Sequence, residues 1–386
     1  MWPVAGAMLL RNGAHLLIKH SSIIENAVVG GKMNSVGGGM AVWTKASAEV
    51  VNCTFYGNVA TAGGGSSQGG ALILWDSASL VASLSTFEAN RAQLAMQESV
   101  GGAITFANGC WGNFSDCTFH NNTASFLGRT VSLLPPDYTL DAQLEADFAA
   151  QCSVPDASGG AFHLHDGGQV PGAKVNAERC IFSENAALGK SALGGAVHVG
   201  SGCFADLVDT SFIRNIAVGK DAQGGGVWSG GSTDFVATHM EGNVVVGYFA
   251  LGGALFVQSG ISTMTGSRAQ YNRATLSRVG VFSSGGALSI APAGEALVYA
   301  CNVHSNTVGG DAFPYQFLAS PSFAIHLLLH TLAAAAHHVC MGQRSSYLHA
   351  RGQVSGCCKK QALGFRTKIR RSRLGVVAFW NSSTAG

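Results

Sequence analysis

The sequence has few charged residues, few prolines and no long uninterrupted apolar run. Asp, Glu, Lys and Arg make up only 11% of the 386 residues and hydrophobic residues 47%, which excludes a disordered polyelectrolyte. No charge-free apolar stretch approaches the roughly 20 residues of a clean membrane-spanning helix. The 10 cysteines contain no Cys-x-x-Cys pair and lack the spacing of a disulfide-dense small domain. We therefore expect a folded chain that does not depend on a disulfide framework.

The small net charge of +2 conceals two regions of opposite sign. Residues 1–312 hold 14 basic and 21 acidic residues, a net charge of −7, whereas residues 313–386 hold 9 basic residues and no acid. The overall balance predicts no specific nucleic-acid partner. The basic stretch Lys368–Arg373 could touch nucleic acid or anionic lipid. The apolar run Phe323–Ala336, interrupted by two histidines, is a weak candidate for membrane association. Residues 313–386 are interpreted as a non-repeat tail, helical or disordered, or not a natural continuation of the reading frame.

Glycine is abundant, with 52 residues, and much of it belongs to an internal repeat. A Gly-Gly-Ala element followed by an apolar residue recurs, and about 20 residues later comes an apolar-x-x-Asn element. Successive asparagines are separated by 32, 32, 32, 63, 30, 28, 29 and 34 residues. The asparagines are Asn26, Asn58, Asn90, Asn122, Asn185, Asn215, Asn243, Asn272 and Asn306.

Each repeat also places similar residues in similar positions around the asparagine. Phenylalanine stands three residues before it in five repeats, at Phe55, Phe87, Phe119, Phe182 and Phe212. Two residues before the aromatic position comes a cysteine, serine or threonine. The residues after Gly-Gly-Ala alternate between apolar and mixed, and we assign Ala41 and Trp228 to the apolar, inward column. This period of two indicates strands with one buried face.

Short strands, a period near 30 and glycine at corners predict an all-β fold, a right-handed parallel β-helix of about nine coils over residues 1–312. Equivalent residues would stack at roughly 4.8 Å, with the phenylalanines inside and the asparagines forming a bonded ladder at a turn. A β-propeller has similar spacing but gives no reason for an asparagine column. Residues 126–157 form an insertion, within which Thr139–Phe148 is expected to be a short amphipathic helix on the flank of the rod.

The repeat resembles that of the chlamydial polymorphic membrane proteins. Phe119-His-Asn-Asn122, Gly101-Gly-Ala-Ile104 and Gly69-Gly-Ala-Leu72 match that pattern directly, and the resemblance covers about residues 5–310. It implies a surface-exposed β-helical passenger of the pectin-lyase-like type, implicated in adhesion. The chain departs from the family by having neither a signal peptide nor a C-terminal barrel pattern, so the export route is not implied.

Enzymes are the natural rival, because parallel β-helices also host polysaccharide lyases and glycoside hydrolases. Such sites need clustered aspartates or paired carboxylates on neighbouring coils. The acids of residues 1–312 are scattered. Asp206 and Asp234 lie 11 and 8 residues after their glycine pairs and are not expected to stack. A non-catalytic role is therefore favoured, with a lyase or hydrolase as the alternative.

Histidines form the best local cluster. His163 and His198 occupy the same outward column on neighbouring coils, and His165 lies two residues from the first. Imidazoles that close could hold a transition metal. The alternative, which we favour, is a set of solvated histidines on a strand face. No cofactor is expected.

Taken together, the pattern predicts an adhesin-like binding rod, located outside the cell or on its surface, whose partner is a glycan or a surface protein. Neither end of the repeat region carries an evident cap. We therefore expect the chain to be part of a longer protein.

Overall fold

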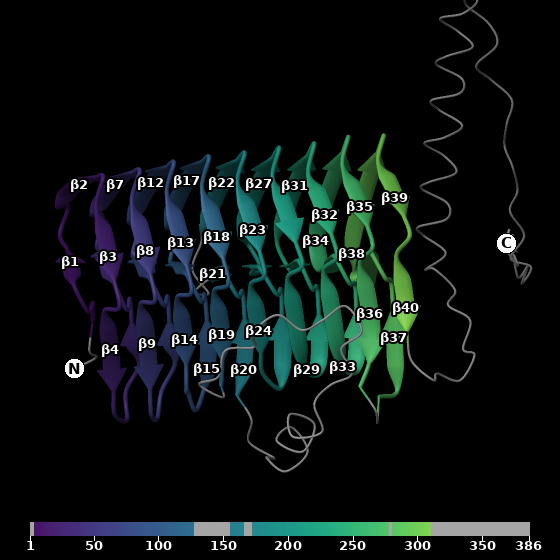
Figure 1. Cartoon of the computed structure of the whole chain (residues 1–386), viewed down its shortest axis with the longest axis horizontal. Coiled ribbons are helices and arrows are strands. Elements are labelled where there is room, and N and C mark those ends of the chain that lie inside the picture. The colour runs from purple at the N-terminus through teal and green to yellow at the C-terminus, as the bar shows by residue number, and fades with distance from the viewer. Residues whose placement is uncertain (1–3, 127–154, 166–171, 278–279, 310–386) are drawn as a thin grey trace, which may run out of the picture. The chain divides into compact units, whose positions relative to one another are not determined.

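The strands of the chain wind into a parallel β-helix. The computed structural model describes residues 4–126, 155–165, 172–277 and 280–309. The first coil contains five short strands, and the same five recur in the coils that follow (Figure 1). They are β1 (Met8–Leu10), β2 (His15–Lys19), β3 (Ser22–Ile24), β4 (Ala27–Gly30) and β5 (Ser35–Val36). Each coil therefore pairs its strands with those of the next coil, not within itself.

The first and second strands of every coil belong to one 16-stranded sheet, because the long strands β34 and β38 run through both positions. The first-strand column continues with β6 (Met40–Trp43), β11 (Leu72–Trp75), β16 (Ile104–Ala107), β21 (Phe162–His165), β26 (Val197–Val199), β30 (Val227–Ser229), β34 (Leu255–Thr265) and β38 (Leu288–Tyr299). The second-strand column continues with β7 (Ser47–Val51), β12 (Ser79–Ser83), β17 (Trp111–Ser115), β22 (Lys174–Glu178), β27 (Phe204–Val208) and β31 (Ser232–Val236).

The third strands form a nine-stranded sheet, which has one strand from each coil. After β3 it contains β8 (Thr54–Tyr56), β13 (Thr86–Glu88), β18 (Thr118–His120), β23 (Ile181–Ser183), β28 (Ser211–Ile213), β32 (His239–Glu241), β35 (Arg268–Gln270) and β39 (Asn302–His304). The expected asparagines follow directly after this sheet, at the next turn.

The fourth and fifth strands share a 15-stranded sheet. The fourth-strand column is β4, β9 (Val59–Ala62), β14 (Arg91–Gln93), β19 (Thr123–Ser125), β24 (Ala186–Leu188), β29 (Ile216–Gln223), β33 (Val244–Leu251), β36 (Arg273–Leu276) and β40 (Thr307–Gly309). The fifth-strand column is β5, β10 (Ser67–Gln68), β15 (Glu98–Val100), β20 (Asp156–Ser158), β25 (Ser191–Leu193) and β37 (Phe282–Ser284). The prediction of an all-β parallel β-helix is confirmed.

The inserted helix predicted within 126–157 and the tail at 313–386 lie outside the described residues. Among the described residues, no helix is long and apolar enough to cross a bilayer.

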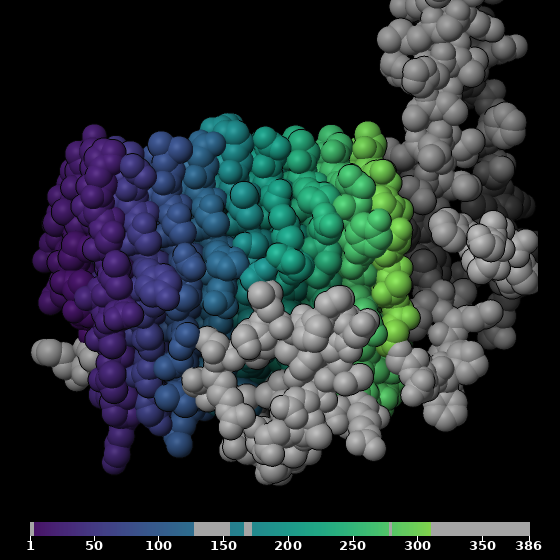
Figure 2. All heavy atoms as spheres, in the orientation of Figure 1, coloured from purple at the N-terminus to yellow at the C-terminus, as the bar shows by residue number. Residues whose placement is uncertain are grey.

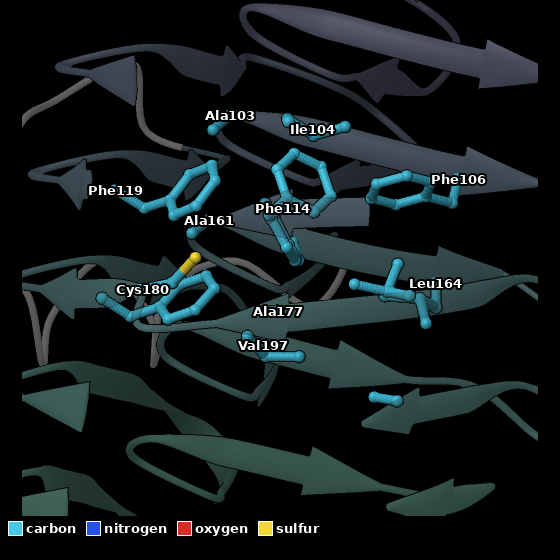
Figure 3. Packing of buried hydrophobic residues seen from close by; sticks show 14 of the residues in the cluster. Ala103, Ile104, Phe106, Phe114, Phe119, Ala161, Leu164, Ala177, Cys180 and Val197 are labelled. Carbon is cyan, nitrogen blue, oxygen red and sulfur yellow. The ribbon is translucent and has the colours of Figure 1, made fainter. Parts of the chain in front are cut away.

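The interior is a continuous stack of side chains. The rings of Phe55, Phe87, Phe119, Phe182 and Phe212 follow one another at centroid distances of 4.8, 4.9, 4.8 and 4.9 Å, with neighbouring planes nearly parallel. Other rings fill the same layer: Phe114 meets Phe119 edge-on at 5.6 Å and Phe106 at 6.0 Å (Figure 3). In the space-filling view successive coils follow one another along the rod, from purple to yellow-green (Figure 2).

The asparagines form a hydrogen-bonded column along the turn after the nine-stranded sheet. In a typical rung, the side-chain oxygen Oδ1 of Asn90 accepts hydrogen bonds from both the backbone nitrogen and the side-chain nitrogen of Asn58, each at 3.0 Å. The side-chain nitrogen Nδ2 of Asn90 donates to Oδ1 of Asn122 at 3.0 Å and to the backbone carbonyl of Phe55 at 2.9 Å. The pattern continues from Asn26 to Asn306. The bonds therefore satisfy backbone groups that would otherwise be buried without a partner at the bend.

The paired glycines close each coil where two parts of the backbone come together. Gly69 has a φ of +63°, a conformation that favours glycine. A Cβ at Gly70 would overlap backbone atoms of Gly102 on the next coil and Arg91 on the opposite wall. Only glycine fits this close approach, which explains why the pair recurs in almost every coil.

Two coils begin with three glycines, and there the inward column predicted from the sequence is shifted by one residue. The first of the three, Gly37 or Gly224, has the positive φ that Gly69 has elsewhere. The third therefore takes the place of the usual alanine. The prediction that Ala41 and Trp228 point inward is wrong: Met40 and Val227 lie in that column, and Trp228 lies in the outward one.

Candidate functional site on the outer face of the rod

The histidines predicted as a metal site lie on β21 and β26, and they are stacked. His163 pairs in register with His198, and their rings are 4.5 Å apart with an interplanar angle of 11°. The indole of Trp228 continues the stack beyond His198 at 4.4 Å. His163 and His198 are only 5% and 9% exposed, so the alternative of solvated histidines is wrong for these two. His165 is exposed.

Burial keeps the two stacked imidazoles neutral. It is the main cause that lowers the pKa of His198 to about 3, and the charge of His165 is the next. Burial also holds the pKa of His163 well below its usual range, assisted by the charges of His198 and His165. Ser158 hydrogen-bonds the His163 ring at 3.0 Å, and a shallow hollow beside it is lined by Glu98 and His165, among others.

The geometry of these rings does not support the predicted metal site. Parallel stacked rings direct the nitrogens of His163 and His198 into separate planes. Throughout the residues that the structure describes, no group of three or more His, Cys, Asp or Glu side chains could hold a metal ion. The two stacked histidines are better described as buried structural residues of the coil wall.

The face with the strongest binding chemistry is the outer surface of β17, β22, β27 and β31, which we call the β17–β31 face. These strands lie side by side on consecutive coils (Figure 1). In each of them the second and fourth residues are buried, and the first, third and fifth point outward. The outward residues therefore form columns that run along the rod.

The first outward column contains two aromatic residues. Trp111, Lys174 and Phe204 are consecutive register partners, and Trp111 is 38% exposed. Two rungs separate Trp111 from Phe204, or about 9.6 Å. A tryptophan left this accessible on a flat strand face is the kind of surface on which sugar rings and apolar side chains pack.

The neighbouring column is made of amides and carboxylates. Asn113, Asn176, Asp206 and Asp234 are successive register partners and face outward beside the aromatic column. Partial burial raises the pKa of Asp206, and the charge of Asp234 adds to that shift. Neither aspartate has a salt-bridge partner within the described part of the chain. The column thus offers hydrogen-bonding groups and uncompensated negative charge.

The expectation that Asp206 and Asp234 do not stack is wrong. The connection between β30 and β31 contains only Gly230 and Gly231, whereas four residues join β26 to β27. The corner is two residues shorter, and the third glycine of its coil, Gly226, accounts for the remaining residue of the difference between 11 and 8. Together these bring Asp234 into register with Asp206.

The acids at the edge of this face differ from the aspartate pair because they have cationic partners. Arg179 forms a bidentate pair with Asp116, at 2.7 and 2.9 Å, and also contacts Glu178. These bonds hold the pKa of Asp116 below its usual range, chiefly through the hydrogen bond from Arg179. The unpaired negative charge of the face is therefore concentrated at Asp206 and Asp234.

Sequence reasoning missed this face, although a signal was present. Trp111 and Phe204 each follow a Gly-Cys pair, Gly109-Cys110 and Gly202-Cys203, at the corner that precedes the second strand. That shared context places the two aromatics in one column, and Asn176 and Asp206 follow from the same alignment.

Two buried cysteines of neighbouring coils, Cys117 and Cys180, are not joined by a disulfide. Cys117 and Cys180 are buried on consecutive coils, and both donate to the carbonyl two residues earlier, at 3.3 and 3.4 Å. The hydrogen bond between the Cys180 and Cys117 thiols, in which Cys180 is the donor, raises the pKa of Cys180, and burial adds to that shift. Serine and threonine take the same role elsewhere in this column, for example Ser85 at 2.8 Å. These thiols therefore belong to the wall and not to a site.

Comparison with known proteins supports the fold. Residues 5–132 match the family model described as the right handed beta helix region, which agrees with the predicted handedness. No curated protein matches the chain. Among solved structures, the chain is similar to a crystal structure of a TibC-catalysed, hyper-glycosylated TibA fragment, at 13% sequence identity. The alignment covers 77% of this chain and 100% of the TibA fragment. Its TM-score of 0.15 is too low to indicate a shared arrangement of coils.

Proposed function

We propose that the chain is a non-catalytic, adhesin-like binding rod that presents the β17–β31 face to an extended glycan or a surface protein. The observation that carries this proposal is the exposed ring of Trp111 beside the polar column that starts at Asn113. The resemblance to the polymorphic membrane protein repeats supports the adhesive role and a location on the cell surface. In this role the stacked interior keeps the face rigid, so little conformational entropy is lost on binding.

Removal of the Trp111 ring tests the proposal. Trp111→Ala is expected to weaken retention on a glycan array by at least about fivefold, because stacking on an aromatic ring contributes roughly 1–3 kcal/mol. Tyr56→Ala is the matched control, since Tyr56 is 40% exposed but lies on β8 of another sheet. Unchanged retention by the Trp111 variant, with melting temperatures equal, would contradict the proposal.

The second candidate, a glycoside hydrolase, is favoured by one observation. Asp206 and Asp234 stand on adjacent rungs, and the spacing of about 4.8 Å is near the roughly 5–5.5 Å between the carboxyls of retaining glycosidases. A reducing-end assay on the glycans that the rod retains distinguishes the two functions. Turnover by the wild-type chain that disappears in Asp206→Asn would establish the enzyme; retention without turnover supports the binding rod.

A further inference from the structure

The two aspartates of the β17–β31 face carry like charges on neighbouring strands, and a cationic ligand would reduce their repulsion. Asp206 and Asp234 are held side by side by the strand register, so their carboxylates repel one another. Both are only partly exposed, and no arginine or lysine pairs with either among the described residues. A positively charged group placed between them would relieve the repulsion.

The surroundings show what shape of cation fits. Phe204 is the neighbour of Asp206 on β27, two residues earlier, and both point outward. On the far side of Lys174, Trp111 provides a second ring in the same column. The carboxamides of Asn113 and Asn176 continue the polar column toward Trp111 and can both donate and accept hydrogen bonds. A ligand along this face would therefore meet apolar ring surface on one side and polar groups on the other.

Resting on the proposed function, we propose that the β17–β31 face binds a glycan that carries ammonium groups, a polymer of the glucosamine type. Its sugar rings lie against Trp111 and Phe204, its hydroxyls bond Asn113 and Asn176, and an ammonium group lies between Asp206 and Asp234. An anionic uronate polymer is excluded by the same carboxylates. Lys174 lies between the two rings and contributes one positive charge against the two carboxylates of Asp206 and Asp234, so these three residues together still carry a net negative charge.

Calorimetric titration of the full chain with three hexasaccharides tests this assignment. The probes are the glucosamine hexamer, the N-acetylglucosamine hexamer and the galacturonate hexamer. The glucosamine hexamer is expected to bind at least about tenfold more tightly than its acetylated form, since charge-assisted hydrogen bonds are about twice as strong as neutral ones. The galacturonate hexamer is expected not to bind.

Two variants separate charge from stacking. Asp206→Asn with Asp234→Asn should weaken the glucosamine hexamer about tenfold or more and leave the acetylated hexamer unchanged. Trp111→Ala should weaken both. Asp76→Asn is the matched control: it removes one carboxylate from an exposed turn whose positive φ asparagine tolerates. Replacing two like charges that repel should not lower the melting temperature, which is measured for each variant.

Several results would overturn the assignment. Equal affinity for the glucosamine and acetylated hexamers, or a double variant that binds as the wild type does, refutes the ammonium site but leaves glycan binding by the rod intact. Binding of calcium chloride that the double variant abolishes, with no effect on either hexamer, would make the pair a simple cation site. If the wild type binds none of the hexamers and retains no glycan on an array, the assignment fails together with the glycan form of the proposed function.

Discussion

At the scale of single residues, the ladder asparagines make more specific bonds than any other side chains of the rod. Asn90 is fully buried, and its side chain takes part in four hydrogen bonds, with Asn58, Asn122 and the carbonyl of Phe55. Two of these bonds involve backbone groups at the bend, which have no other way to reach water. An aspartate would lack the amide donors, and a glutamine would be too long for the turn.

Truncation of one rung should therefore be costly. Asn90→Ala leaves the backbone nitrogen of Asn58 buried and unpaired, at about 1–3 kcal/mol, and removes three further ladder bonds at about 0.5–1.5 kcal/mol each. We expect a loss of about 4 kcal/mol in the free energy of unfolding, measured by urea denaturation. Asn113→Ala, on an exposed position of β17, should change it by less than about 0.5 kcal/mol. Similar losses for both variants would show that the ladder bonds contribute little.

Residue columns differ in how far they can be predicted from the sequence. The interior accepts few residue types, so Phe119 and Asn122 identify their columns wherever they recur. The outward columns accept almost any residue, and their register depends on corner lengths that vary from coil to coil. For that reason the sequence does not reveal that Asp234 is in register with Asp206. The third glycine of its coil likewise hides the fact that Trp228 lies in the outward column and not in the inward one.

At the scale of elements, the stacked rings on β21, β26 and β30 make the wall sensitive to acid. Because burial lowers the pKa values of His163 and His198, both rings are neutral in the folded chain near neutral pH. An unfolded chain has histidines of pKa about 6.5 and binds protons more readily below that value. Stability is therefore unaffected above about pH 6.5 and decreases as the pH falls below it.

The size of this effect can be measured. Each stacked histidine should cost about 1.4 kcal/mol for every pH unit below about 6.5, so urea midpoints should fall clearly between pH 7.5 and 5.5. His198→Phe keeps a ring between His163 and Trp228 but cannot titrate there. We expect it to reduce the acid-dependent loss by about half. The same loss in the variant as in the wild type would show that the effect does not come from His198.

At the scale of the whole molecule, stability is distributed along one dimension, because each coil contacts only the coils before and after it. The central coils contain the phenylalanine stack from Phe55 to Phe212, whose rings are fully buried. The strand β38 lies at the other extreme, and none of its residues from Leu288 to Tyr299 is fully buried. Resistance to opening should therefore vary along the rod.

Amide hydrogen exchange is the measurement that detects this gradient. Amides of β16, β17 and β18 should exchange only through large-scale unfolding, whereas those of β38 should exchange faster by several orders of magnitude. Asn90→Ala should accelerate exchange mainly in the coils next to it. Uniform protection from β6 to β38 would instead show that the rod opens as a single cooperative unit.

The bond between Asn122 and Asn185 has a consequence for how such a chain can change. Sixty-three residues separate these two asparagines and thirty-two separate Asn90 from Asn122, yet the side chains of both pairs meet at 3.0 Å. An interval that is 31 residues longer (63 against 32) leaves the bond between successive rungs unchanged. The corner after β19 is therefore a natural acceptor for foreign loops, and peptides grafted there should be displayed without loss of folding.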